Sequence, residues 1–323
     1  MRPTTHMLAG VDLMTTVIVG SRASRLARAQ VREWLGPMRK RFPHVTFKQR
    51  VVLEGGDEDR RTSSLAEVAA KTESGNAFSG KQQRALLAGD VDVVVHSFKD
   101  LPTEPTPGLV VLPVPGPRED VRDVLCGHTL ATLPTGARVG TGAQRRIAQL
   151  LSLRPDVVTV PIRGNVPPRL GRLKGPGAVD AVLLAAAGLG RLGIGAEVSE
   201  HLDVETFPPS PGQGALAIQV REGDESLREL LAGIGDAVVD ATVRAERSML
   251  NALHGGCSVP VGAHATVDAD VLRLSGTVTS LDGKEQVRAT ASGPLDNPEE
   301  LGQAVAGELL ERGADGILAA IRS

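Results

Sequence analysis

The chain has 323 residues, a formal net charge of −2 and 41% hydrophobic residues. This length allows two or three domains with a core each, and the near-neutral charge argues against bulk attraction to nucleic acid or to membranes. Two cysteines are too few for a disulfide framework and lack metal-site spacing, so no metal is expected. The first 20 residues hold no apolar run long enough for a signal peptide or a membrane span, which predicts a cytoplasmic protein.

Three domains are predicted, because the apolar pattern changes character along the chain. Residues 1–14 are assigned to an N-terminal extension, with Met1 or Met14 as the natural start. The assigned segments are 15–115 with 215–232 for the first domain, 118–208 for the second and 237–323 for the third.

The first two domains alternate buried strands with helices, which predicts two related, doubly wound α/β lobes. The proline- and glycine-rich run Phe207–Gly214 favours neither helix nor strand and is predicted to cross between domains. A periodic helix is expected over Ala143–Leu153. The predicted strands are Thr16–Val19, Val51–Leu53, Val91–Val95 and Leu109–Val114 in the first domain, and Val124–Cys126, Arg138–Gly140, Val157–Ile162 and Val179–Ala185 in the second.

The third domain is predicted to be a smaller α+β unit with an antiparallel sheet. A long helix is expected over Ala237–Leu253 and a second one over Pro298–Arg312. Between them, alternating patterns predict strands at Val259–Val267 and Val271–Ser280.

Cys257 lies in the run His254–Pro260, which contains two adjacent glycines and a proline. Such a run favours a loop, and a cysteine presented on a loop indicates chemistry at its sulfur rather than packing. Cys126 lies in an apolar run and is predicted to be a core residue.

Polar residues follow the predicted strand Val91–Val95, in the run His96–Pro102. Open α/β sheets bind ligands beyond the carboxyl ends of their strands, so this run is a candidate site, although a capped turn would give the same pattern. Asp100 is the candidate proton carrier, and Lys99 beside it can hold its charge state.

Arginine dominates the positive charge, with 29 arginines and 7 lysines among 36 basic residues. A GC-rich genome accounts for most surface arginines, so position must identify the others. Arg145 and Arg146 fall at a predicted helix start, where a cation opposes the helix dipole by roughly 0.3–1 kcal/mol. We therefore predict an anion site there. Arg163 ends a predicted strand and Arg169 follows in the next helical turn, so both are expected at one inter-domain cleft.

The run Gly188–Gly193 matches the dinucleotide-binding fingerprint. It comes in mid-chain, and no strand clearly ends in an acidic residue about twenty positions later, as the motif requires. We therefore reject a nucleotide site.

Six ordered runs, from about Val17 to the C-terminus, resemble porphobilinogen deaminase, also called hydroxymethylbilane synthase. Together they are far more specific than any one run alone. They are Gly20–Ser24, His96–Pro102, Arg163–Val166, Ala187–Gly193, Pro211–Ala215 and Gly255–Cys257.

The resemblance implies two α/β lobes similar to type II periplasmic binding proteins, an active cleft between them, and a third domain that carries the cysteine. It implies a monomeric transferase of tetrapyrrole (porphyrin and heme) biosynthesis, which condenses four porphobilinogen molecules and releases hydroxymethylbilane by hydrolysis, the product passing to uroporphyrinogen-III synthase. Cys257 would hold a covalent dipyrromethane cofactor, and Asp100 would protonate the departing amine.

The resemblance also assigns binding residues, because each pyrrole ring carries an acetate and a propionate. Arginine binds carboxylates in a bidentate manner. The implied cofactor-binding residues are Lys99, Arg145, Arg146, Ser24 and Asp57. The implied substrate-binding residues are Arg22, Arg163, Arg169, Arg191 and Gln30. Alternatively, Arg22 is a surface charge at a helix start and Gln30 faces solvent.

The chain departs from the family pattern at four positions. Gly142 and Ala143 replace two serines before the arginine pair, Pro168 replaces a threonine, and Glu67 stands where many relatives have lysine. Because the proton carrier, the cysteine and the arginines remain, we predict an active deaminase. The four changes suggest a divergent second copy with weaker cofactor binding. Two other hypotheses are a degenerate paralogue that binds pyrroles without turnover and a two-lobed solute-binding protein.

Overall fold

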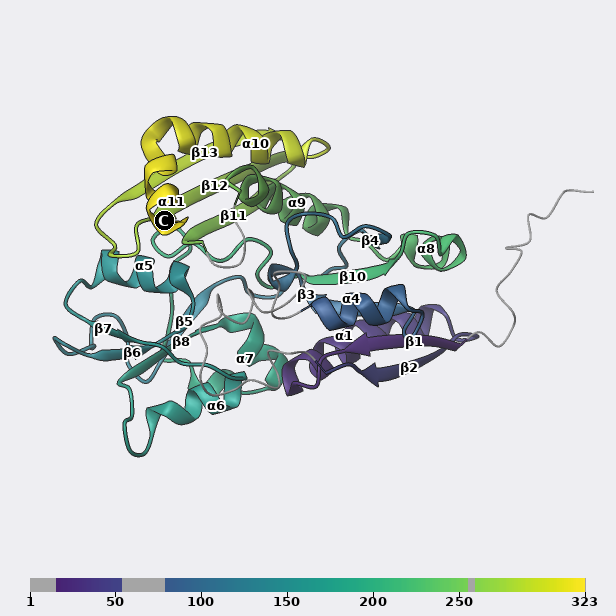
Figure 1. Cartoon of the computed structure of the whole chain (residues 1–323), viewed down its shortest axis with the longest axis horizontal. Helices are drawn as coiled ribbons and strands as arrows, with labels where there is room; N and C mark the ends of the chain where they lie inside the picture. The colour runs from purple at the N-terminus through teal and green to yellow at the C-terminus, as the bar shows by residue number, and fades with distance from the viewer. Residues whose placement is uncertain (1–15, 54–78, 255–258, 323) are drawn as a thin grey trace, which may run out of the picture.

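The computed structural model describes residues 16–53, 79–254 and 259–322. Within this part of the chain, two five-stranded sheets and one three-stranded sheet organise the molecule. Figure 1 shows the two larger sheets side by side, with the smaller sheet and its helices packed across one side of both. The fold is therefore mixed α/β, as the sequence pattern predicts.

The first sheet has the strand order β2-β1-β3-β10-β4. Its first three strands are parallel, whereas β10 runs antiparallel to both of its neighbours. Helices α1 and α8 pack on one face, and α4 packs on the other, because parallel strands bury both faces. The elements are β1 (Thr16–Ser21), α1 (Arg25–Arg41), β2 (Thr46–Val51), α4 (Gly80–Leu87), β3 (Val93–Ser97), the 3₁₀ turn η1 (Phe98–Asp100), β4 (Leu109–Val111), β10 (Leu216–Arg221) and α8 (Glu225–Ala232).

The second sheet repeats this plan with the order β7-β6-β8-β5-β9. Three parallel strands are again followed by an antiparallel one, β5. Helix α5 packs on one face and α6 and α7 lie on the other. The elements are β5 (Asp123–Cys126), β6 (Arg138–Gly140), α5 (Gln144–Leu153), β7 (Val158–Val160), α6 (Val166–Leu170), η2 (Gly171–Leu173), β8 (Ala181–Ala185), α7 (Ala186–Leu192), η3 (Gly195–Glu197) and β9 (Glu200–His201).

The third sheet is a fully antiparallel meander, β11-β12-β13. Helices α9 and α10 lie on it, and their apolar faces share one core with the inner face of the sheet. The elements are α9 (Ala237–Ala252), β11 (Val261–Asp268), β12 (Val271–Thr279), β13 (Gln286–Pro294), α10 (Pro298–Leu309), η4 (Leu310–Ala314) and α11 (Asp315–Arg322).

One strand was predicted at the wrong position. The second strand is Thr46–Val51 rather than Val51–Leu53. It is an edge strand, in which Phe47 alone is buried, so the strand carries no continuous apolar run. Val51 and Leu53 are instead about half exposed, at 45% and 55%. The apolar-run rule also missed β13, whose residues alternate without strong hydrophobicity.

The other predicted strands and helices are present, with ends that differ by a few residues. Strand β4 ends at Val111, two residues before Pro113, which lacks the backbone N–H that a strand needs. The run Gly188–Gly193 forms most of helix α7 and its C-terminal turn rather than a phosphate loop.

The run Phe207–Gly214 connects the second sheet to β10 of the first without a strand or helix of its own. Gly214 has φ +87° and lies so close to Glu119 that a Cβ would collide with the carbonyl oxygen of that residue. The crossing therefore requires glycine at this position.

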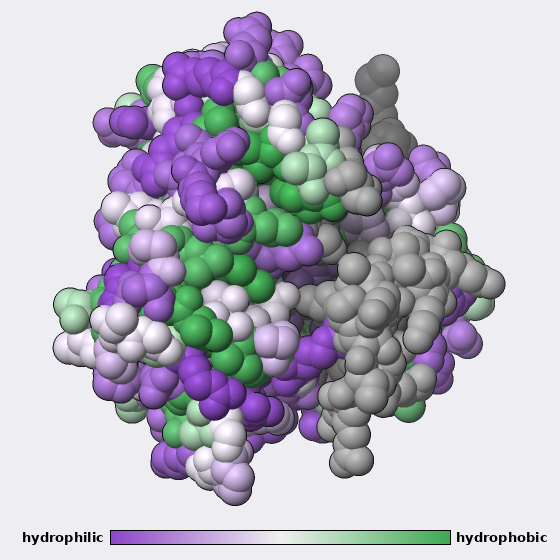
Figure 2. All heavy atoms as spheres, turned by 60° about the vertical axis from the view of Figure 1, so that its left-hand side comes forward, coloured by the Kyte–Doolittle hydropathy of each residue, from purple (hydrophilic) through white to green (hydrophobic). Residues whose placement is uncertain are grey.

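The surface is mixed in polarity. On the face turned forward in Figure 2, hydrophilic side chains surround a narrower band of hydrophobic ones. Partial exposure of single apolar residues is normal for a folded chain. Among the described residues, no helix combines the length and the apolar character that crossing a membrane requires.

Candidate active site

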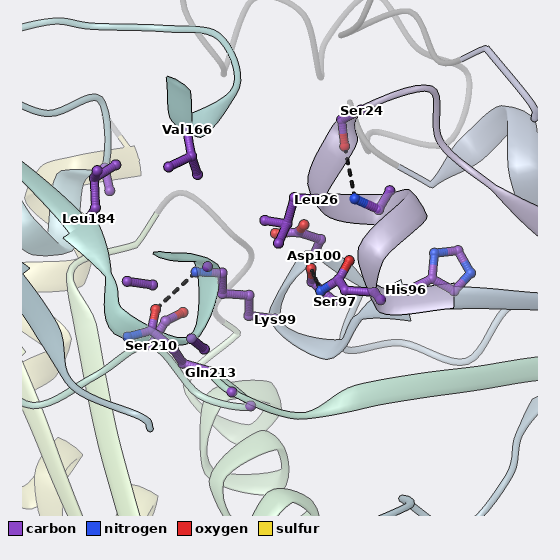
Figure 3. Close-up of a pocket in the computed structure, with 18 of the residues that line it drawn as sticks. Ser24, Leu26, His96, Ser97, Lys99, Asp100, Val166, Leu184, Ser210 and Gln213 are labelled. Atoms are coloured by element: carbon purple, nitrogen blue, oxygen red, sulfur yellow. Dashed lines mark hydrogen bonds between the residues drawn. The ribbon is translucent and has the colours of Figure 1, made fainter. Parts of the chain in front are cut away.

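A cavity of about 310 Å³ lies between the first two sheets. It is lined by the end of β3, the start of α1, the starts of α5, α6 and α7, and the crossing segment. Ligands of open α/β sheets bind at the carboxyl ends of strands, which is where β3 and β8 deliver their residues here. Figure 3 shows side chains from both lobes converging on this space.

Asp100 and Lys99 lie on the turn η1, which follows β3 directly. Both side chains line the cavity and are partly buried. Lys99 Nζ donates a hydrogen bond of 2.9 Å to Gln213 Oε1 on the crossing segment, as Figure 3 shows. Burial lowers the pKa of Lys99 to about 8, an effect that Arg146 increases and Asp100 opposes. The predicted strand-end site is therefore part of the cavity.

Arg145 and Arg146 also line the cavity, but a protein carboxylate holds them both. Asp123, at the start of β5, is fully buried and lies 2.7 Å from a guanidinium nitrogen of each. Arg145 Nη1 donates further to Pro208 O, and Arg146 Nη1 donates to Leu183 O. The anion at this helix start is thus the carboxylate of Asp123, which the chain itself supplies. A site for an added anion there stays a prediction.

Asp123 stays ionised in this cluster. Burial alone would raise its pKa, but Arg145 and Arg146 outweigh that effect and hold the pKa well below its usual range. Two guanidinium groups face one carboxylate, so the cluster retains an excess positive charge. An added carboxylate in the cavity is therefore attracted to it.

Arg163 and Arg169 are held less completely. The Nη2 atom of Arg163 is buried and has no hydrogen-bond partner in the described structure. Arg169 Nε donates to the carbonyl of Gly164 at 2.7 Å, which turns its guanidinium toward the cavity that it lines. Burial lowers the pKa of Arg169 to about 10, with Arg146 adding to the effect. A buried donor without a hydrogen-bond partner destabilises the folded state, so the Arg163 nitrogen indicates an acceptor that a ligand would supply.

Arg191 connects the two lobes at the edge of the cavity. Its Nε lies 2.7 Å from Glu33 Oε2 on α1, and its Nη2 donates to Gly214 O at 2.9 Å. Arg22 precedes α1 and lines the cavity, so it is not simply a surface charge at a helix start.

Ser24 and Gln30 have structural tasks in α1. Ser24 is the N-cap, because its Oγ accepts a hydrogen bond from Ala27 N at 3.1 Å. Gln30 is 3% exposed and donates to Ser97 Oγ at 2.7 Å, so the alternative that it faces solvent is wrong. Both residues line the cavity.

The glycine at position 142 has a steric reason. A Cβ there would lie 2.9 Å from the carbonyl oxygen of Ile162, which leaves no room for the serine of the family pattern. Thr141 keeps one hydroxyl in this loop, and its Oγ1 accepts from Ala143 N at 3.3 Å. Pro168 occupies the first turn of α6, where proline is tolerated.

Three residues singled out from the sequence, Cys257, Asp57 and Glu67, lie outside the described residues. Conversely, three residues important for the cavity were not identified from the sequence: Asp123, Gln213 and Glu33. Gln213 falls within a quoted motif, but nothing in the motif assigns it a role. Asp123 and Glu33 carried no local signal, because the arginines that they bind are distant along the chain.

The charge of the cavity defines what it can hold. Among the residues that the structure describes, seven cationic side chains and one carboxylate, that of Asp100, line it. Such a lining fits a ligand with several carboxylates. The buried Arg163 nitrogen, which has no partner among the described residues, could bind one of them. A dipyrromethane that carries acetate and propionate groups is such a ligand. The fold and the cavity thus define a two-lobed α/β protein with a polycarboxylate site beside a candidate proton donor.

The sequence matches two family models. Residues 17–229 match the dipyromethane cofactor binding domain of porphobilinogen deaminase, and residues 241–311 match the C-terminal domain of porphobilinogen deaminase. The chain belongs to the porphobilinogen deaminase family. This membership gives no support to the solute-binding hypothesis.

Curated relatives match over nearly the full length of the chain. Porphobilinogen deaminase of Moorella thermoacetica is 44% identical over 96% of this chain and 98% of its own. That of Thermus thermophilus is 44% identical over 96% of this chain and 100% of its own. Among solved structures, the Escherichia coli sulphonate-binding protein SsuA matches 74% of this chain and 70% of its own at 12% identity and a TM-score of 0.36, too low to support an argument.

Proposed function

We propose that the chain is a transferase that joins four porphobilinogen molecules into a linear tetrapyrrole. In each condensation the aminomethyl carbon of one porphobilinogen forms a bond to the free α-carbon of a pyrrole. The amine leaves as ammonia, and the α-carbon loses its proton. Hydrolysis then releases hydroxymethylbilane, so four porphobilinogens and one water give one product and four ammonia molecules.

One observation carries this proposal: among the described residues that line the cavity, Asp100 is the one carboxylate beside seven cationic side chains. A polycarboxylate substrate needs the cations for binding. A departing amine needs a proton, which a carboxylic acid next to the reacting carbon can deliver. The cavity therefore combines both requirements of the reaction.

The residues divide into proton handling and binding. Asp100 would protonate the departing amine and then accept the proton that the α-carbon loses. Lys99, Arg22, Arg163 and Arg169 would bind the acetate and propionate groups and keep the reacting carbon near Asp100.

Arg145, Arg146, Ser24 and Asp57 complete the proposed cofactor site, and Arg191 and Gln30 the proposed substrate site. Cys257 would hold a dipyrromethane through its sulfur. When bound, this group supplies the nucleophilic α-carbon on which the chain is extended.

The remaining expectations follow from the same function. We propose that the protein is a cytoplasmic monomer of three domains, with the boundaries given above. We also propose that its product passes to uroporphyrinogen-III synthase. A linear product with a reactive hydroxymethyl group is a suitable substrate for an enzyme that closes the ring. Gel filtration with light scattering would test the monomer.

Intact-mass spectrometry and porphobilinogen turnover test the proposal together. The purified chain should carry a covalent dipyrromethane and should release one ammonia per porphobilinogen consumed. Cys257→Ser should lose both the adduct and the turnover. Asp100→Asn should keep the adduct, while turnover falls about 10²- to 10⁴-fold, the usual range for a general acid.

Arg172→Gln is the matched control, because Arg172 is exposed and does not line the cavity. It should keep the adduct and the turnover of the original chain. A folded chain with a bare thiol that leaves porphobilinogen unchanged would instead identify a paralogue without turnover.

A further inference from the structure

A cluster of arginines on the outer face of α1 is not used by the proposed reaction. Arg25, Arg28 and Arg32 are spaced three and four residues apart, so they lie on one face of the helix. With Arg191 and Leu192 of α7 they line an open hollow of about 220 Å³. We call these four arginines the outer arginine cluster. Figure 1 shows α1 and α7 beside one another where the two lobes meet.

The three α1 arginines have no counter-ion among the described residues. Among the described residues, none of their side chains takes part in a hydrogen bond or ion pair, and all three residues are exposed. The first turn of α1 also contains no acidic residue. Like charges at these spacings repel one another, and cations near a helix start oppose its dipole, so the arrangement destabilises α1 unless an anion is bound.

The hollow and the active cavity share one lining residue. Arg191 lines both of them. Its partner Glu33 offsets one charge of the outer arginine cluster and fixes the Arg191 guanidinium at the lobe boundary. A ligand at the cluster therefore lies at the edge of the cavity and in the field of its cations.

We propose that the outer arginine cluster is a second polycarboxylate site, which captures carboxylate ligands at the mouth of the active cavity. Guanidinium groups favour carboxylates, and the four side chains come from both lobes, so a ligand with several carboxylates spans them better than a single anion does. Resting on the proposed function, the ligand is porphobilinogen or the carboxylates of the lengthening pyrrole chain.

Calorimetric titration with mellitate, a rigid benzene hexacarboxylate, tests the site without any turnover. The variant Arg28→Gln/Arg32→Gln removes two charges from the cluster. Lys40→Gln/Lys48→Gln removes two exposed charges outside the hollow from the same lobe and is the matched control. The first variant should bind mellitate about tenfold more weakly than the original chain, and the control less than about twofold more weakly.

Mellitate can also enter the active cavity, and Arg163→Gln separates the two sites. Binding that survives Arg163→Gln and is lost in Arg28→Gln/Arg32→Gln supports the outer site. Binding that is lost with Arg163→Gln and unchanged in Arg28→Gln/Arg32→Gln overturns the outer site. Equal mellitate affinities of Arg28→Gln/Arg32→Gln and Lys40→Gln/Lys48→Gln overturn it as well.

Kinetics then connect the site to the reaction. At low ionic strength, Arg28→Gln/Arg32→Gln should lower kcat/KM for porphobilinogen about threefold or more with kcat unchanged, and high salt should abolish the difference. A difference that salt leaves intact contradicts electrostatic capture. If the original chain shows no turnover, the proposed function fails, while the mellitate titration still decides the site.

Discussion

Two groups of arginines in the active cavity differ in their hydrogen-bond partners. One group is bound by a carboxylate of the chain, and the other keeps a donor without a partner among the described residues. Arg145 and Arg146 are bound to the buried carboxylate of Asp123 and to backbone carbonyls. Arg163 keeps a buried nitrogen without a hydrogen-bond partner in the described structure. The first group is part of the folded scaffold even without a ligand, whereas Arg163 is completed by one. One residue type therefore serves stability in one place and binding in the other.

Asp123→Asn should give the largest effect, because it leaves two buried guanidinium groups without their shared carboxylate. Breaking a buried ion pair costs about 3–5 kcal/mol. Urea unfolding should show a loss of that size in the free energy of unfolding. Arg163→Gln, in the same unfolding experiment, should lose less than about 0.5 kcal/mol. Equal losses in the two variants would show that the groups do not differ.

Lowering the pH should weaken the scaffold through His96, which the fold keeps neutral beside the cavity. Burial lowers the pKa of His96 to about 4 from 6.5. Protonation therefore favours the unfolded chain, and the stability that His96 contributes is complete above pH 6.5 and is lost as the pH falls toward about 4. The loss should reach about 3 kcal/mol.

Urea unfolding at successive pH values would measure how steeply the free energy of unfolding falls with pH. In His96→Gln this slope should be smaller across the same window, while the contribution of Asp123, whose pKa lies below its usual range, is lost only under more acidic conditions. An unchanged slope in His96→Gln would assign the acid sensitivity to other groups.

Arg163→Gln should weaken binding without weakening the fold. A hydrogen bond between charged groups contributes about 1.5–3 kcal/mol, so KM for porphobilinogen should rise about tenfold or more. Steady-state kinetics would measure it, with Arg172→Gln as a control that carries the same charge change on an exposed residue. If KM stayed constant, the buried nitrogen of Arg163 would have no ligand to bind.

The smallest effect concerns Lys99, whose pKa burial lowers to about 8. The lysine is a cation below that pH and neutral above it, so its attraction for a substrate carboxylate fades as the pH rises through about 8. KM should increase a few-fold over this range, roughly as the loss of one solvent-screened charge contact implies. Lys99→Arg keeps its charge, and its KM should stay flat in the same titration.

Much of the fold follows from local pattern. Strand β6 and helix α9 were predicted within a residue of their observed ends. Helix α9 has a clear apolar repeat at helical spacing. The edge strand β2 was misplaced, since an edge buries too few residues to leave a pattern. The candidate site was predicted in part: Asp100, Lys99, Arg163 and Arg169 do line one cavity.

The sequence by itself determined the family, most of the strands and helices, and the residue types that chemistry requires: a carboxylic acid after a buried strand, arginines at helix starts and a cysteine on a glycine-rich run. Only the tertiary structure decided which charges neutralise one another. Asp123 on strand β5 binds Arg145 on helix α5, and Glu33 binds Arg191 across 158 positions and two lobes. Such pairings depend on how the sheets are placed in space, and no local pattern along the chain records that placement.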